Sequence, residues 1–105
     1  MAGFFSKGTD ELGVPLSIRS DKDAMEVLRA WTTKQGLSVT LRSGVWEDPA
    51  AYGIMLADLA RHIANAFKQT HGKEIATTLQ RIREGLNAEL DSPTDVPTGE
   101  IQKRS

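Results

Sequence analysis

An amphipathic run from Pro49 to Thr70 constrains the fold of this chain more than any other feature. Asp48 is a suitable N-cap, because Pro49 disfavours a helical conformation at the residue before it and itself fits the first helical position. Gly72 supplies a C-terminal stop. At 100° per residue, the following side chains share one arc: Tyr52, Met55, Leu56, Leu59, Ile63, Ala66, Phe67 and Thr70. We therefore predict an amphipathic helix over residues 49–70.

A second helix is predicted from about Lys73 to Leu90. Its apolar side chains form one narrow stripe, spaced by four, three, four and four residues: Ile75, Leu79, Ile82, Leu86 and Leu90. Such a stripe is closer to coiled-coil than to globular packing. Only a short joint at Gly72 separates this run from the first helix. We therefore expect an antiparallel helix pair.

Residues 25–42 have the composition of a β-hairpin. Two runs rich in β-branched and aromatic residues, 25–33 and 37–42, flank a short segment that ends at Gly36. A two-residue turn at Gln35-Gly36 is predicted. A hairpin packed on two antiparallel helices gives an α+β fold.

This turn also predicts which side chains share a face of the hairpin. Trp31 is expected to pair with Thr40, and Arg29 with Arg42, on a polar face. The other face is expected to be apolar and to carry Leu28, Ala30, Thr32, Val39 and Leu41. We prefer this register because it separates polar from apolar side chains.

The two ends of the chain lack the periodicity of its middle. With 105 residues there is room for one small domain. We predict a flexible N-terminal arm at residues 1–22, one α+β domain at 23–90, and a disordered tail at 91–105, where prolines, a glycine and small polar residues gather. Val14, Leu16 and Ile18 alternate and can add a third strand at the edge of the hairpin.

The charge balance and the lack of long apolar runs exclude several classes of protein. Thirteen basic residues face fourteen acidic ones, and no basic run exceeds two residues. Nucleic-acid binding draws on a basic surface, so we expect no nucleic-acid partner. No apolar run approaches the roughly 18 residues that span a bilayer, and the first residues lack a secretory signal, so we expect no membrane association and a cytoplasmic location. The absence of cysteine excludes disulfides and thiolate metal sites.

Three residues are candidates for chemistry: Glu47, Asp58 and His62. His62 follows Asp58 by one helical turn, so the pair can form an oriented general base or part of a metal site. The alternative, which we favour, is a surface pair on the solvated helix face. Glu47 beside Asp48 can form an acid–base pair, but capping and the helix dipole account for both carboxylates. Nucleotide-binding and hydrolase motifs are absent, so we expect no cofactor and no metal, and we favour a non-catalytic role.

The polar face of the hairpin is the candidate interaction surface, with Arg29, Trp31, Thr40 and Arg42. Trp and Arg are enriched at binding hot spots. Trp31 is either exposed on this face or covered by the N-terminal arm, and the sequence leaves both open.

A small core, a narrow apolar stripe and open hairpin edges favour a protein-interaction module. We expect it to form a homo-oligomer through the hairpin, the second helix or both, or to bind an unidentified protein partner. The alternative is a small-ligand binder or enzyme that uses Asp58 and His62 near Glu47.

The string Leu41-Arg-Ser-Gly-Val-Trp-Glu-Asp-Pro-Ala-Ala-Tyr-Gly, followed by Leu56-Ala-Asp-Leu-Ala-Arg-His-Ile-Ala, resembles a small bacterial family of alphaproteobacterial type. That family is classed as a domain of unknown function. The resemblance extends over roughly residues 23–95, and its Trp-Glu-Asp-Pro part is fairly specific. It implies a shared fold, and it transfers no activity, cofactor or site residue.

Overall fold

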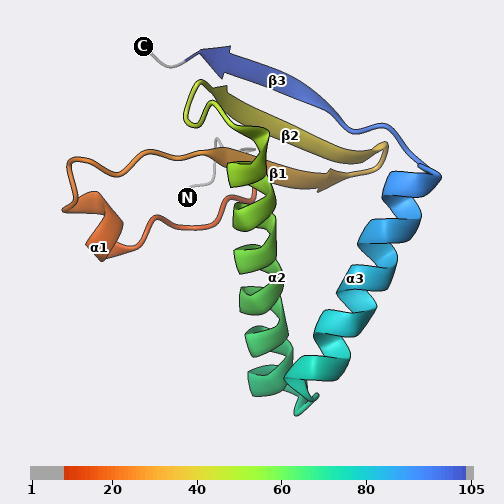
Figure 1. Ribbon diagram of the computed structural model, residues 1–105. Helices are drawn as coiled ribbons and strands as arrows, with labels where there is room; N and C mark the ends of the chain where they lie inside the picture. The colour runs from red at the N-terminus through yellow and green to blue at the C-terminus, as the bar shows by residue number, and fades with distance from the viewer. Residues whose placement is uncertain (1–8, 104–105) are drawn as a thin grey trace.

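The protein consists of one three-stranded sheet and a pair of long helices (Figure 1). The computed structural model describes residues 9–103. The element order is α1 (Leu16–Arg19), β1 (Leu28–Thr33), β2 (Gly36–Ser43), α2 (Pro49–His71), α3 (Ile75–Asp91) and β3 (Thr98–Lys103). The strand order is β1-β2-β3, with β1 antiparallel and β3 parallel to β2. The predicted α+β class is therefore confirmed.

The β1–β2 hairpin forms in a register two residues from the predicted one. Thr33 pairs with Gly36, so the turn residues are Lys34 and Gln35 and not Gln35 and Gly36. The Thr33 hydroxyl accepts a hydrogen bond from the Gln35 amide (3.1 Å) and donates one to the Gly36 carbonyl (2.8 Å), which favours the observed turn. Because side chains alternate along a strand, a shift of two residues leaves each one on its predicted face.

Helix α2 begins and ends where its sequence signals indicate. The Asp48 carboxylate accepts a hydrogen bond from the Ala50 amide (3.0 Å), and Pro49 occupies the first helical position. At the other end Gly72 adopts a left-handed conformation with φ of 67°, and its amide donates to the Lys68 carbonyl. Glycine has no Cβ to oppose this conformation, so the chain can reverse and enter α3 within three residues.

Helices α2 and α3 pack against each other only near this joint. Ala64 and Thr78 are the two buried residues of the described chain, one from each helix. Figure 1 shows the two helices meeting at the joint and separating toward the sheet. Side-chain exposure follows that divergence: along α3, Leu79 and Ile82 are half-buried, Leu86 is 45% exposed and Leu90 is 71% exposed. In the described residues, neither α2 nor α3 packs along a strand. The predicted packing of the hairpin on the helix pair is therefore wrong, because the helices contact each other near the joint and then point away from the sheet.

The third strand comes from residues 98–103, so the prediction of a disordered tail over 91–105 is wrong for these residues. Two side chains fix the preceding turn: the Glu89 carboxylate accepts the Thr94 amide (2.7 Å), and the Asp95 carboxylate accepts the Val96 amide (2.8 Å). Gly99 allows the close approach to β2, because a Cβ there would overlap the Val39 carbonyl oxygen. The pairing of β3 with β2 relies on backbone hydrogen bonds and needs no regular alternation of apolar side chains. Composition alone therefore did not predict this strand.

The proposed N-terminal edge strand at Val14, Leu16 and Ile18 is wrong. Residues 16–19 instead form the single helical turn α1. Pro15 has φ of −61°, and its carbonyl accepts the amides of Ile18 and Arg19 at 3.0 Å, which starts a helical turn. Residues 1–8 of the predicted arm and 104–105 of the predicted tail lie outside the described residues. Within the described part, no helix is long and apolar enough to cross a bilayer.

Candidate functional site

The four residues of the predicted interaction surface do lie together. Arg29 pairs with Thr40 across β1 and β2, while Trp31 and Arg42 lie two residues away on the same side of the sheet. All four line one pocket. We call this set, Arg29, Trp31, Thr40 and Arg42, the polar sheet face.

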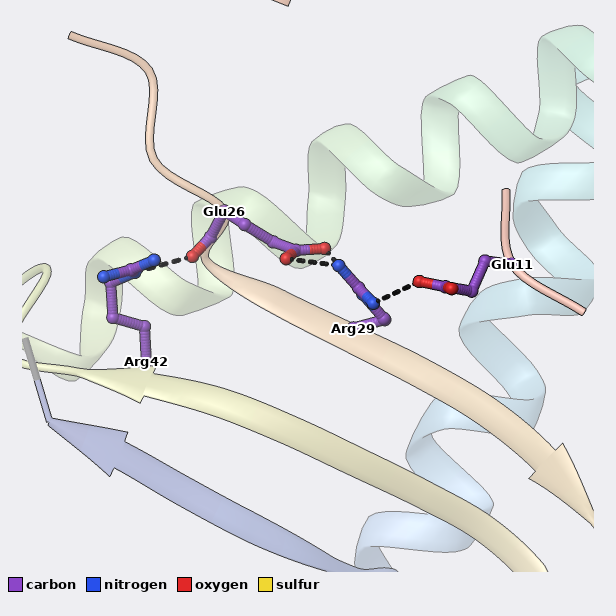
Figure 2. Close-up of polar contacts among 4 residues, drawn as sticks. All are labelled: Glu11, Glu26, Arg29 and Arg42. Atoms are coloured by element: carbon purple, nitrogen blue, oxygen red, sulfur yellow. Dashed lines mark hydrogen bonds and ion pairs between the residues drawn. The ribbon is translucent and has the colours of Figure 1, made fainter. Parts of the chain in front are cut away.

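Arg29 is held in place by two carboxylates. Its Nε and Nη2 donate to the two oxygens of Glu26 at 2.9 and 2.8 Å, and its Nη1 donates to Glu11 at 2.8 Å (Figure 2). Hydrogen bonding and attraction to Arg29 lower the pKa of Glu26, with a smaller contribution from Arg42. The bidentate contact orders the Arg29 side chain, although its exposure to solvent limits the gain in stability.

Arg42 uses only one of its five guanidinium donors within the described chain. Its Nε donates to the backbone carbonyl of Glu26 at 2.8 Å, as Figure 2 shows. Its backbone amide donates to the Val27 carbonyl at 2.9 Å. Arg42 is half-buried and, among residues 9–103, forms no ion pair with a carboxylate. Its terminal nitrogens therefore remain available to a ligand.

Trp31 is half-buried, so neither of its two predicted environments describes it fully. The Arg29 guanidinium carbon lies 6.0 Å from its ring centroid, within cation–π range. The N-terminal arm lies beside β1, where Glu11 binds Arg29. An apolar pocket of about 580 Å³ lies between residues 10–15 of the arm and β1. Trp31 lines this pocket and also the pocket at the polar sheet face.

Both long helices leave apolar side chains exposed to solvent. On α2 they share an arc of about 80°. The set on both helices, which we call the apolar helix rows, consists of Leu56, Leu59, Ile63 and Phe67 from α2 and Ile75, Leu86 and Leu90 from α3. Ile54 is also exposed, but it lies on the opposite side of α2 from Ile63. Each row therefore follows one side of its helix, whereas Ile54 is an isolated apolar residue.

The sheet contributes a second apolar surface, opposite the polar sheet face. We call it the apolar sheet face, and it carries Leu28, Ala30, Leu37, Val39, Leu41 and Ile101. None of these residues is buried; Leu37 is 44% exposed and Ile101 is 73% exposed. This face has the composition of a core layer, yet no described helix packs on it. The N-terminal arm borders only its edge, at Leu28 and Ala30.

The structure does not bring Glu47, Asp58 and His62 into one site. All three are exposed, and none lines either of the two pockets described above. Within the described residues Asp58 and His62 form no hydrogen bond or ion pair, although they are one helical turn apart. Trp46 beside Glu47 contacts Tyr52 edge to face, with ring centroids 5.0 Å apart, and so anchors the start of α2. Among residues 9–103, no cluster of three or more acidic or histidine side chains could hold a metal ion.

Sequence reasoning missed three residues at the polar sheet face: Glu11, Glu26 and Gln102. Glu26 lies three positions before Arg29, an ion-pair spacing that could have been noticed. Glu11 lies 18 positions before Arg29, and Gln102 comes from β3, so only the folded chain brings them here.

Comparison with known proteins gives a family and solved structures of similar fold. The model of the family described as "Domain of unknown function (DUF5076)" matches residues 11–94. A solved structure described as a "putative pyruvate dehydrogenase" from the photosynthetic bacterium Rhodopseudomonas palustris is 35% identical in sequence, with a TM-score of 0.68. The match covers 93% of this chain and 97% of that one. No curated protein matches the chain.

Proposed function

Because this chain belongs to the DUF5076 family, whose description names no activity, we propose a function from its geometry: it is a non-catalytic module that self-associates through apolar faces of its helices and sheet. A second copy would cover the apolar helix rows and the apolar sheet face. The exposure of these two surfaces is the observation that carries the proposal.

The amount of exposed surface supports this reading. The chain exposes 8948 Å², whereas a compact monomer of 11.5 kDa exposes about 5800 Å². Ten residues of the chain lie outside residues 9–103. Even a fully extended segment of that length would account for only about 1600 Å² of this difference. About 1500 Å² per chain remains, which exceeds the roughly 800 Å² that each partner buries in a standard interface.

The shape of the molecule supports the same conclusion. Its Cα radius of gyration is 16.3 Å, whereas a compact domain of this length has about 13 Å. The helices diverge from each other and from the sheet, and the segment with α1 projects to one side, so both contribute to this extension (Figure 1). A chain that leaves side chains such as Leu86 and Ile63 in water loses much of the hydrophobic stabilisation available to it.

A second copy of the chain fits this surface better than an unrelated partner does. Every copy carries both apolar surfaces, so two copies related by a two-fold axis can cover each other's helices and sheets at once. The interface would be rich in Leu, Ile and Phe and poor in charge, as is typical of obligate homodimers.

Sedimentation equilibrium of the full chain between about 1 and 200 µM tests the proposal. We expect a dimer or larger oligomer that dissociates on dilution, or that persists throughout because the folded state requires it. A folded, monodisperse monomer over the whole range would overturn self-association. The Ile63→Lys variant should be monomeric or unfolded, whereas Ile54→Lys, on the other side of the same helix, should assemble like the natural chain.

A further inference from the structure

The polar sheet face contains a pocket of about 240 Å³ that self-association does not require. Its polar and aromatic lining comes from three strands and from the residues that enter β1: Glu26, Arg29, Trp31, Thr40, Arg42 and Gln102. Because it lies on the opposite side of the sheet from the apolar sheet face, a second copy on that other face would leave it open.

Arg42 is the group in this pocket with unused binding capacity. Its Nε contact with the Glu26 carbonyl and its position in β2 fix where the guanidinium lies. The four remaining N–H donors meet no acceptor among the described residues. A half-buried guanidinium with open donors is suited to a carboxylate, whose two oxygens match its planar fork.

The acidic residues at the pocket do not compete for Arg42. The Glu26 carboxylate receives two hydrogen bonds from Arg29, and Glu11 receives a third. Arg29 therefore balances much of the negative charge nearby, while Arg42 keeps a positive charge that no described carboxylate contacts directly. An incoming anion would meet Arg42 as the open cation of the pocket.

The other lining residues indicate what the rest of the ligand resembles. Trp31 offers a planar apolar surface, and its contact with Arg29 helps to hold the ring in place. Neither the Thr40 hydroxyl nor the Gln102 amide forms a side-chain hydrogen bond with another described residue, so both can donate to the ligand. The volume of the pocket limits the ligand to a small molecule.

From this arrangement we infer that the polar sheet face binds a small planar carboxylic acid. Arg42 receives the carboxylate through paired N–H donors, Thr40 and Gln102 add hydrogen bonds, and Trp31 packs against the planar part. No chemical step is involved, since the pocket holds and orients an anion.

NMR titration of the full ¹⁵N-labelled chain tests this inference. Sodium benzoate is the probe, and benzamide is its matched neutral counterpart. We expect a saturable shift of the Trp31 indole N–H with benzoate, an unaffected Trp46 indole as internal control, and binding about tenfold weaker or more with benzamide. Equal binding of the two compounds, or no saturable shift with benzoate, would overturn the inference. So would inorganic phosphate that binds as tightly as benzoate, because the site would then recognise any anion.

Variants locate the ligand. Arg42→Gln should weaken benzoate binding by about tenfold or more, while Arg19→Gln, an arginine in α1 that does not line the pocket, should leave it unchanged. If Arg42→Gln fails to fold because it loses the Glu26 carbonyl contact, Thr40→Val serves in its place and should weaken binding measurably. Unchanged affinity in the folded variant would refute this site. The outcome is independent of the oligomeric state, which sedimentation measures separately.

Discussion

Truncation of Ile63 in the apolar row of α2 is the sharpest test of self-association. Ile63 is 44% exposed in the single chain, so association can bury at most that part of it. Isoleucine to alanine removes about three methylene equivalents, worth about 0.8 kcal/mol each when fully buried. The exposed part therefore corresponds to about 1 kcal/mol per copy, and a two-fold dimer contains the residue twice. We expect Ile63→Ala to weaken the dimer by about 2 kcal/mol, which is about 30-fold in Kd.

Ile54 provides the matched control for this substitution. It is the same residue type on the same helix, is 65% exposed, and lies on the side of α2 away from the apolar row. Ile54→Ala carries the same change in volume and helix propensity, so we expect an unchanged Kd by sedimentation equilibrium. Circular dichroism confirms that both variants remain helical. If the two variants weaken association equally, or if neither does, the assignment of the interface to this row is refuted.

Three further predictions follow from contacts within the chain. Thr78→Val should stabilise the fold by about 1 kcal/mol and so raise the thermal midpoint, because the buried Thr78 hydroxyl has no hydrogen-bond partner. Thr77→Val, at an exposed position, should not raise the midpoint. A lower midpoint for Thr78→Val would contradict this prediction. Arg29 lowers the folded-state pKa of Glu26 below its ordinary value of 4.5. The natural chain should therefore be more stable than Glu26→Gln above that pH, and should lose this advantage as the pH falls through the lowered pKa. A stability difference in thermal melts that does not depend on pH would refute the contribution of the ion pair. Gly99→Ala should detach β3 from β2, because the new Cβ would overlap the Val39 carbonyl. Hydrogen exchange of residues 98–103 should then accelerate, whereas Glu100→Ala should leave it unchanged. Equal protection of these amides in both variants would count against the close approach.

At the polar sheet face, the sequence pattern predicted some of the residues, and only the folded chain revealed the others. Alternation along two strands was enough to place Arg29, Trp31, Thr40 and Arg42 on one side, even though the predicted register was two residues away from the real one. The pocket needed more, because Gln102 arrives on β3 and Glu11 arrives from the N-terminal arm. Contacts between residues so far apart in sequence leave no periodic trace, so composition and spacing could not reveal them.

The sequence by itself determined the two long helices and the β1–β2 hairpin. Asp48 and Pro49 set the start of α2 and Gly72 sets its end, through cap and backbone interactions that act within a few residues. The spacing of apolar side chains determined whether each of these segments forms a helix or a strand. Only the tertiary structure decided that residues 98–103 complete the sheet and that the helices diverge from it. These features depend on backbone pairing and on the direction of the joints between elements. Both arise from contacts across the whole chain, which a local pattern does not encode.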